Sequence, residues 1–246
     1  MTTALKFRVQ CSDCPIRHRA VCARCDDDEL AALEKIKFYK SYAAGQTIAL
    51  RGEELSTVAS VVSGTAVLNR SMEDGRTQMV GLLLPSDFIG RPGRETIQFD
   101  VTAITDVTLC CFHRKPFEDL VHRTPHIADR LLEMALDELD AAREWMLLLG
   151  RKTAREKIAS LLALVARRTR LPGVEDPSEI HHVELPISRE AMASYLGLTI
   201  ETVSRQITKL RADGVIGLEG TRAITIPDFG VLLAETGDDD DGGLIF

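Results

Sequence analysis

The sequence predicts an α+β protein in which an antiparallel β-roll is followed by a long helix and a C-terminal winged helix-turn-helix. Three observations lead to this fold class. Short β-rich runs between residues 38 and 112 alternate with glycine turns, apolar heptads follow Pro125, and two short helical segments after residue 187 flank one glycine. At 246 residues the chain has room for two packed domains.

The net charge of −7 averages over regions of opposite sign. Residues 151–170 carry seven arginines and lysines against the single acidic Glu156, whereas Asp238 to Asp241 form an acidic run. The overall charge therefore does not exclude DNA binding, and we expect the basic stretch to adjoin the helix-turn-helix.

No apolar run reaches the roughly 18 to 20 residues that a membrane helix needs. Residues 1–10 also lack the apolar core of a signal peptide. We therefore expect a cytoplasmic protein without membrane contact. Because thiols stay reduced in the cytoplasm, clustered cysteines are expected to bind metal or sense redox state rather than form disulfides.

Four of the six cysteines lie in residues 1–26, in the pattern Cys11-x2-Cys14-x7-Cys22-x2-Cys25. This segment lacks apolar periodicity, so we expect a ligand to order it. Thiolates favour zinc or iron-sulfur clusters, and the spacing by itself leaves both open. The run Asp26 to Asp28 is then an N-cap signal for a short amphipathic helix over residues 29–36.

Turn residues divide the region from Phe38 to Phe112 into short strands at the spacing of an antiparallel roll. Residues 58–68 and 77–84 flank Asp74-Gly75, a strong signal for a hairpin turn. Cys110 and Cys111 are neighbours at the end of this region, where successive strand residues face opposite sides of the sheet. They should therefore not both reach one ligand.

After Pro125 the chain is expected to stay helical to about Gly150. Apolar residues recur along this segment at heptad spacing, namely Leu132, Ala135, Leu139, Ala142, Met146 and Leu149. They predict a dimer interface, because an identical helix is the simplest partner for such a seam. Packing of the same face on the chain's own roll is the alternative, since three heptads are borderline for a coiled coil.

Residues 153–170 predict another helix, and a polar connector leads from it to the helix-turn-helix. Ser188 can cap a first helix, Gly197 supplies the turn, and Thr199 can cap a second helix running to about Ala212. One face of the second helix is apolar and should pack, with Ile200, Val203, Ile207 and Leu210. Residues 215–218 and 222–226 predict the hairpin of a wing.

The other face of the second helix is polar and carries Glu201, Ser204, Arg205 and Thr208. Arg205 can donate a fork to guanine and Glu201 can accept from cytosine, so the two can specify one G·C pair. Candidates for thymine or phosphate contacts are Thr199, Ser204, Lys209, Arg211 and Arg222. A solvated polar helix face is the alternative interpretation.

Twenty residues at 186–205 read Pro-Ile-Ser-Arg-Glu-Ala-Met-Ala-Ser-Tyr-Leu-Gly-Leu-Thr-Ile-Glu-Thr-Val-Ser-Arg, behind a β-roll and a long helix. This arrangement resembles the CRP/FNR superfamily of transcription regulators over almost the whole chain. Glu201, Ser204 and Arg205 match the Glu-x-x-Ser-Arg readout of the FNR branch. The resemblance implies a cyclic-nucleotide-binding-like jelly roll, a homodimer on double-stranded DNA with TTGAT-like inverted repeats, and contacts with RNA polymerase.

The resemblance also implies a [4Fe-4S] cluster held by three N-terminal cysteines and a fourth on a strand of the roll. One FNR subgroup has the spacing Cys-x2-Cys-x7-Cys, which falls on Cys11, Cys14 and Cys22. Counting back from the helix entry at 117–120 places Cys110 at the fourth position. In such regulators the intact cluster strengthens dimerisation and so permits operator binding by an anaerobic activator, whereas oxygen dismantles it.

Two alternatives to this ligand set remain. The trio Cys14, Cys22 and Cys25 has the same gaps in reverse order, so Cys25 can replace another N-terminal ligand. A zinc-stabilised regulator that responds to another effector is the competing interpretation of the same thiols.

Other functions find little support in the residues. The phosphate cassette of a cyclic-nucleotide receptor is absent from residues 86–101, where Arg91 and Arg94 could bind an anion. His113 could ligate haem iron, as any exposed histidine could. No nucleophile has a plausible base and no glycine loop suits a phosphate, so we expect no enzyme.

These patterns divide the chain into five parts. They are a cysteine-rich cluster-binding segment (1–26), a β-roll sensor domain (27–125), a dimerisation helix (126–152), a winged helix-turn-helix domain (153–233) and an acidic tail (234–246).

Overall fold

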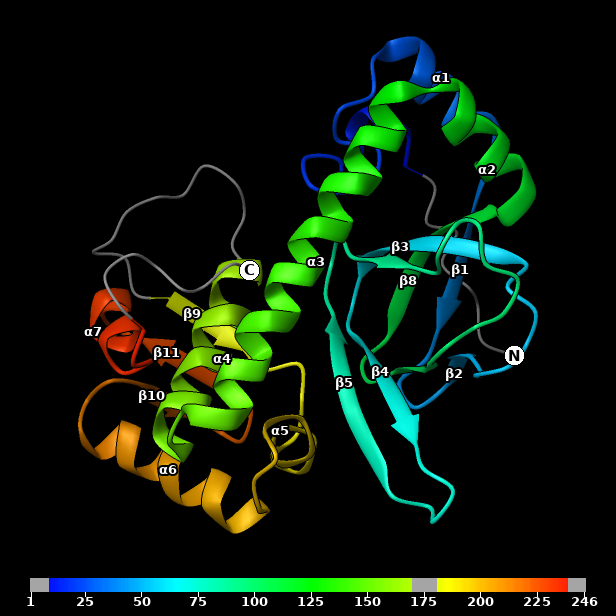
Figure 1. The fold of residues 1–246 in the computed structure, drawn as a ribbon. Coiled ribbons are helices and arrows are strands. Elements are labelled where there is room, and N and C mark those ends of the chain that lie inside the picture. Colours follow the sequence, from blue (N-terminus) through cyan, green and yellow to red (C-terminus); the bar gives the residue numbers. More distant parts are fainter. Residues whose placement is uncertain (1–8, 170–180, 239–246) are drawn as a thin grey trace. The chain divides into compact units, whose positions relative to one another are not determined.

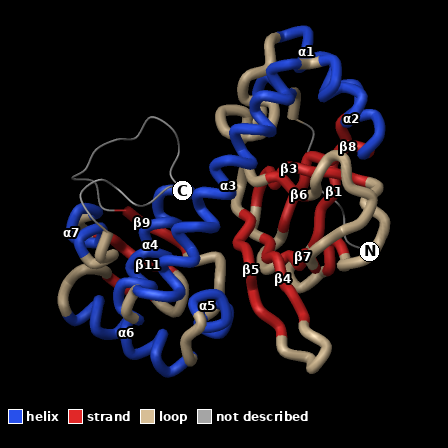
Figure 2. Tube along the Cα trace, viewed as in Figure 1, coloured by secondary structure: helices blue, strands red, loops and turns tan. Residues whose placement is uncertain are grey.

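The computed structural model describes residues 9–169 and 181–238. The chain forms two compact units, Met1–Ala135 and Leu136–Phe246, and the boundary between them falls within one long helix. Figure 1 labels the elements of both units, and Figure 2 distinguishes helices from strands. Across the described ranges, no helix combines the length and the apolar character that a membrane crossing requires.

The first unit contains two antiparallel sheets, so the predicted roll is confirmed. One sheet has the strand order β1-β8-β3-β6 and the other has the order β2-β7-β4-β5. The strands are β1 (Lys37–Tyr42), β2 (Thr47–Ala49), β3 (Thr57–Ser63), β4 (Ala66–Ser71), β5 (Thr77–Leu83), β6 (Phe88–Ile89), β7 (Asp100–Ala103) and β8 (Val107–His113).

The hairpin predicted around Asp74-Gly75 forms between β4 and β5, but residues 58–68 are not one strand. This run divides at Gly64, so that β3 joins one sheet and β4 joins the other. Gly64 has a φ of 81°, and a Cβ built on it would lie 2.0 Å from the carbonyl oxygen of Asp106. Only glycine fits this corner between the two sheets.

Side-chain alternation along β8 separates two hydrophobic cores. Leu109 and Cys111 belong to the core between the sheets, whereas Cys110 and Phe112 belong to a second core on the outer face of the β1-β8-β3 sheet. The expectation that the two neighbouring cysteines face opposite sides is confirmed.

Helices cover this second core at one end of the roll, as Figure 1 shows. They are α1 (Asp27–Ile36), α2 (Arg114–Arg123) and the first turns of α3 (Pro125–Arg151). Asp26 caps α1 in a capping box. Its side chain accepts a hydrogen bond from the backbone N–H of Glu29 at 2.9 Å, and the Glu29 carboxylate accepts one from the backbone N–H of Asp26 at 2.9 Å. Leu33, Phe117 and Ile127 bring the three helices into one core, each with no exposed surface.

The second unit holds the winged helix-turn-helix. Besides the remainder of α3 it contains α4 (Ala154–Thr169), β9 (His181–Glu184), α5 (Arg189–Leu196), α6 (Ile200–Ala212), β10 (Gly217–Glu219), β11 (Ala223–Ile226) and α7 (Phe229–Ala234). Ser188 and Thr199 cap α5 and α6 as predicted, by accepting from backbone N–H groups three residues ahead. Gly197 ends α5 with a φ of 63°, which explains the glycine in the turn.

The wing is a three-stranded sheet rather than a two-stranded hairpin. Strand β9 pairs with β11 and extends the sheet in the order β10-β11-β9. The sequence predicts a polar connector there, but His181 and Val183 alternate inward and are buried. Other connector residues, including Arg170, Pro172, Gly173 and Pro177, lie outside the described residues.

Residues 234–238 of the predicted acidic tail are part of the folded unit. Glu235 pairs with Arg155, with oxygen–nitrogen distances of 2.6 and 2.9 Å, and Asp238 pairs with Lys152. These carboxylates hold the end of α7 to the start of α4. Residues 239–246 of the predicted tail lie outside the described residues.

Candidate cofactor cavity and nucleic-acid interface

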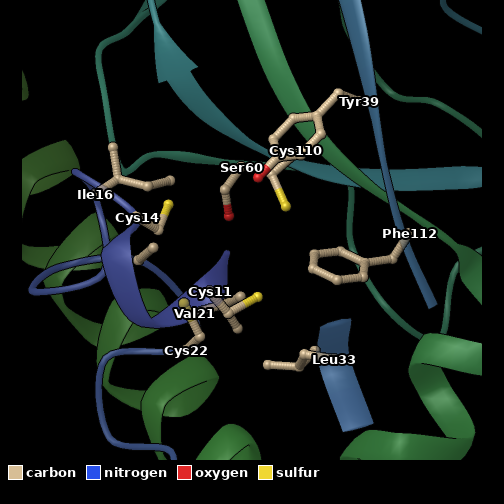
Figure 3. Close-up of a pocket in the computed structure, with 11 residues that line it drawn as sticks. Cys11, Cys14, Ile16, Val21, Cys22, Leu33, Tyr39, Ser60, Cys110 and Phe112 are labelled. Carbon is tan, nitrogen blue, oxygen red and sulfur yellow. The ribbon is translucent and has the colours of Figure 1, made fainter. Parts of the chain in front are cut away.

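A cavity lies in the first unit where the N-terminal loop covers the outer face of the β1-β8-β3 sheet. Strand register sets Tyr39, Cys110 and Ser60 opposite one another in the three neighbouring strands, so their side chains share this face. Figure 3 shows Cys110 and Ser60 pointing into the cavity from the sheet.

The loop presents three of its four cysteines to this cavity, namely Cys11, Cys14 and Cys22. Cys11 opens a short 3-10 turn, η1 (Cys11–Asp13). Further along the loop, three apolar side chains are at most 4% exposed and anchor it in the second core, namely Ile16, Ala20 and Val21. The sequence predicts that a ligand orders this segment. In the structure, apolar packing also holds it.

Cys25 and Cys111 are not among the residues that line the cavity. Cys25 is buried at the end of the loop, where its carbonyl oxygen accepts a hydrogen bond from Arg17 at 3.3 Å. Cys111 is buried in the core between the sheets. The cavity is therefore lined by Cys11, Cys14, Cys22 and Cys110, whereas Cys25 packs in the same hydrophobic core without lining the cavity.

A buried cation lies beside Cys11. The side chain of Lys37 is 6% exposed, and its Nζ donates to the carboxylate of Glu34 at 2.8 Å and to the Sγ of Cys11 at 3.5 Å. Glu34 also accepts from the backbone N–H of Cys11 at 2.8 Å. This carboxylate therefore fixes both the lysine and the turn that carries the first cysteine.

Burial disfavours the thiolate forms of Cys11 and Cys110. Desolvation raises the pKa of Cys11 to about 12 and raises that of Cys110 further, although Lys37 opposes both shifts. A ligand that binds thiolates must displace these protons as it enters.

The cavity sulfur atoms are not gathered around one point in this structure. A tetrahedral zinc site holds its sulfurs about 4 Å apart, because each Zn–S bond is about 2.3 Å long. Within the part of the chain that the structure describes, no three cysteine sulfurs lie mutually within 4.8 Å. A cubane cluster separates its ligands more, since each thiolate binds a different iron at a corner of the cube.

Another group of possible ligand atoms lies within 4.8 Å, formed by Asp26, Glu29 and His126. Its carboxylates already serve the cap of α1, and Glu29 also hydrogen-bonds the His126 ring at 2.9 Å. These atoms are explained by the joint between α1 and α3.

Arg24, Arg130 and Glu133, called the arginine clamp below, tie the cysteine loop to α3. Arg130 donates to the carbonyl oxygen of Arg19 at 2.6 Å and also to the carboxylate of Glu133, and Arg24 pairs with that same carboxylate. The first turns of α3 are therefore held to the loop that carries three of the cavity cysteines.

Every residue of the predicted dimer seam on α3 is exposed in the single chain. Leu132, Leu139 and Met146 have 61%, 46% and 74% of their surface exposed, and Ala135, Ala142 and Leu149 are exposed beside them. The structure adds Leu136 and Leu147, which the heptad pattern does not include and which are also exposed. The dimer seam and its alternative, packing of this face on the chain's own roll, both stay predictions.

The candidate reading helix α6 has the predicted polar face. Glu201, Ser204 and Arg205 are exposed, whereas Val203, Ile207 and Leu210 are buried. A backbone N–H and the Thr199 hydroxyl hold the pKa of the Glu201 carboxyl below its usual range, so this side chain is an acceptor at neutral pH. Ile200 is a correction, because it lies in the first turn with 45% exposed rather than in the packed face.

The candidate phosphate contacts lie at the rim of this helix and on the wing. Lys209 and Arg211 are exposed in the last turn of α6, and Arg222 is exposed where β10 turns into β11. The Thr199 hydroxyl is occupied by the cap of α6, since it accepts from the backbone of Thr202 at 3.2 Å.

The basic stretch adjoins the helix-turn-helix, and three of its seven cations have structural roles. Lys152 pairs with Asp238, and Arg155 pairs with Asp213 and with a second carboxylate on the same unit. Lys157 is 9% exposed and donates to backbone carbonyl oxygens of Leu149 and Leu196. These three cations hold the domain together and are not free for DNA.

Sequence reasoning missed Ser60, Lys37 and the arginine clamp. Ser60 could have been found from strand alternation, because a lone serine within the apolar run of β3 is a signal of special use. The clamp joins residues more than a hundred positions apart, and no local pattern announces such a contact.

A β-roll with a ligand-sized group of thiols, joined in one chain to a winged helix-turn-helix, defines a DNA-binding transcription regulator. Family models agree in both units. Residues 39–124 match the cyclic nucleotide-binding domain, and residues 156–235 match the Crp-like helix-turn-helix domain. The chain belongs to the CRP/FNR family of transcription regulators.

Comparison with individual relatives indicates the branch of the family to which the chain is most similar among those compared. The chain is 64% identical to the transcriptional activator protein FnrL of Cereibacter sphaeroides, over 96% of this chain and 95% of that protein. It is 39% identical to the nitrogen fixation regulation protein FixK of Bradyrhizobium diazoefficiens, over 85% and 86%. The solved structure of FixK2 from Bradyrhizobium japonicum superposes with a TM-score of 0.74 at 31% identity, covering 83% of this chain and 99% of that one.

These comparisons make the chain a transcriptional activator of the FNR/FixK group and not an enzyme. The Crp-like helix-turn-helix implies DNA binding, and regulators of this family are dimeric.

Proposed function

We propose that this activator holds a [4Fe-4S] cluster with Cys11, Cys14, Cys22 and Cys110, responds to oxygen through it, and binds TTGAT-like inverted repeats as a dimer when the cluster is intact. The observation that carries the proposal is the cavity into which the loop and β8 bring these four thiols. At promoters it would act on RNA polymerase, as an activator must.

The donor set fits such a group. Four thiolates are the usual ligands of a cubane iron-sulfur cluster, and the spacing of these sulfurs exceeds that of a zinc site. The remaining lining is mostly apolar, which limits access of water to the metal. When bound, the cluster supplies iron that reacts with oxygen.

The chain's own residues explain how occupancy of the cavity can reach the dimer seam. Ligation by Cys11, Cys14 and Cys22 would fix the loop against β8, and the arginine clamp holds that loop to α3. The same helix carries the exposed apolar stripe. A small change in the position of the loop would therefore act on a marginal helix pair. A coupling of about 1–3 kcal/mol between cluster binding and dimerisation would be enough to change the fraction of dimer.

The test begins with protein purified without oxygen. Wild-type protein should be brown and contain iron and acid-labile sulfide. Serine substitutions at Cys11, Cys14, Cys22 and Cys110 should each abolish the chromophore and operator binding. Cys25→Ser and Cys111→Ser are matched controls that should keep both.

Three results would count against the proposal. If Cys25→Ser lost the colour and Cys11→Ser kept it, the N-terminal ligands would be Cys14, Cys22 and Cys25. Colourless wild-type protein with stoichiometric zinc would favour the zinc-stabilised regulator. Operator binding that is the same before and after exposure to air would remove oxygen as the signal.

A further inference from the structure

Ser60 is the unexplained polar residue of the cavity. Its side chain is on β3 directly opposite Cys110 on β8, in a register that places both on the same face of the sheet. The residue is 2% exposed, and none of the described groups forms a hydrogen bond with its Oγ. Figure 3 shows the hydroxyl directed into the space that the thiols surround.

The other polar side chains around the cavity already have partners. The hydroxyl of Tyr39 donates to the carbonyl oxygen of Val9 at 3.2 Å. The ammonium group of Lys37 donates to Glu34 and to the Sγ of Cys11. On the same face of β3, Ser60 lies between Val58 and Val62, so an apolar residue would suit the position. The buried hydroxyl therefore costs free energy unless something accepts its proton.

We propose that the Ser60 hydroxyl donates a hydrogen bond to a sulfur of the metal group held by the four cysteines, either a cluster sulfide or the Cys110 thiolate. This inference rests on the proposed function, because only a bound cluster places an anionic sulfur acceptor in the cavity. A hydrogen bond to sulfur stabilises the more negatively charged, reduced state of the cluster and so raises its reduction potential.

Serine therefore acts as a positioning and tuning residue and not as a ligand. Its oxygen enters the cavity beside Cys110, whereas the four sulfurs complete the ligand set. Because a lower potential makes the cluster easier to oxidise, loss of the hydroxyl should also shorten its lifetime in air.

The first experiment compares Ser60→Ala with Ser63→Ala, both prepared without oxygen. Ser63 ends the same strand, is exposed, and does not line the cavity. Iron and sulfide content should match the wild type in both variants. In Ser60→Ala the equilibrium constant for cluster reduction should fall about tenfold, or about 59 mV for one electron, whereas Ser63→Ala should keep the wild-type potential.

The cluster should also reveal the exchangeable proton directly. Iron–sulfur stretching bands in the resonance Raman spectrum of the wild type should shift between H₂O and D₂O, and part of that shift should vanish in Ser60→Ala. A purely structural role for the serine would change thermal stability but leave this isotope effect in place.

A second pair of variants keeps the test decisive if the alanine protein assembles no cluster. Threonine and valine have nearly the same shape and differ in the hydroxyl, so Ser60→Thr should retain the wild-type potential and Ser60→Val should lose it. If Ser60→Thr and Ser60→Val had the same reduction potential, the inference about the hydroxyl would be overturned, although the proposed cluster would stand. Wild-type protein without iron and sulfide would overturn the proposed function as well.

Discussion

At the scale of single residues, we expect base readout by the polar face of α6 to depend mainly on two side chains. Arg205 extends from an exposed position, held by one contact of 3.4 Å between its Nη2 and the Thr202 hydroxyl oxygen. Glu201 is one turn earlier on the same face and ionised. This pairing of a donor fork with an acceptor matches one G·C pair, and it would be a poor design for phosphate contacts alone.

We therefore expect Arg205→Ala to lose discrimination at that base pair, at a cost of about 1–3 kcal/mol per half-site. Glu201→Gln should relax the same position, because an amide offers both a donor and an acceptor. Binding titrations on the operator and on operators altered at the pair would measure the loss.

Lys209→Ala is the matched control for this prediction, since Lys209 is exposed in the last turn of the same helix. It should weaken binding to all operators alike and lower the salt dependence. Uniform weakening by Arg205→Ala would instead make Arg205 a phosphate contact.

Much at this scale follows from sequence because it is local. Ser188, Gly197 and Thr199 act within three residues of themselves, and strand alternation is enough to separate Cys110 from Cys111. The fates of Lys152 and Arg155 could not be predicted, because their carboxylate partners lie more than fifty positions away. A run of charged residues in the sequence reveals neither the partners of its side chains nor their burial.

At the scale of elements, α3 makes specific side-chain contacts near both of its ends. Its first turns are held by the arginine clamp, and its later turns place Trp145 against Tyr195 of α5, with ring centroids 4.2 Å apart. The heptad pattern predicts the helix and its seam, but neither contact has a periodic signature. Strand β9 was similarly hidden, since four residues with two histidines carry little strand signal.

Removal of the clamp should uncouple the loop from the helix. We expect Glu133→Gln to keep the chromophore, because the cysteines are untouched, but to lower operator affinity of the loaded protein toward that of the cluster-free form. The ion pair between Arg24 and Glu133 should contribute little to folding, since Arg24 is half exposed.

A double-mutant cycle with Arg24→Ala tests this prediction. The operator affinities of the single and double variants should be non-additive, because both changes remove one contact. Asp129→Asn is the control, because Asp129 is exposed on the same helix and is not part of the arginine clamp. Wild-type operator affinity in Glu133→Gln would show that the signal travels by another route.

The joint between α1 and α3 should make the first unit sensitive to pH. The hydrogen bond from His126 to Glu29 raises the pKa of the imidazole above its ordinary 6.5. A raised pKa in the folded state stabilises the fold fully below the unfolded pKa, and this contribution is lost as pH rises through the folded value.

Unfolding midpoints in denaturant should therefore separate wild type from His126→Gln most at about pH 5–6 and should converge above the raised pKa. His122→Gln is the control, because His122 is exposed on α2 and its hydrogen bonds do not include Glu29. A difference that grows toward alkaline pH would contradict the assigned sign.

At the scale of the whole molecule, function depends on a second copy of the chain. The stripe on α3 is wider than the heptads alone suggest, because Leu136 and Leu147 are exposed beside it. Opposing this, Asp137 and Glu144 bring like charges to a parallel helix pair. Arg143 relieves part of the repulsion within its own helix, since it donates to Asp140 at 2.9 Å.

We expect such an association to be close to the balance between monomer and dimer, so one truncation in the seam should have a visible effect. We expect Leu139→Ala to leave the anaerobic chromophore intact while weakening both dimerisation and operator binding, because the cysteines lie outside the seam. Sedimentation under nitrogen at several protein concentrations would measure the dimer constant. Val231→Ala is the matched control, since Val231 is an apolar residue of α7 with the same 46% exposed as Leu139.

The same measurement after exposure to air decides how the signal acts. If cluster loss shifts the wild type toward monomer, and Leu139→Ala protein is already monomeric under nitrogen, dimerisation is the switch. A wild type that stays dimeric without its cluster but no longer binds the operator would contradict that mechanism. The remaining route would then be a reorientation of the reading helices, in which the Trp145–Tyr195 stack is the expected lever, and Trp145→Ala should abolish operator binding without changing the dimer constant.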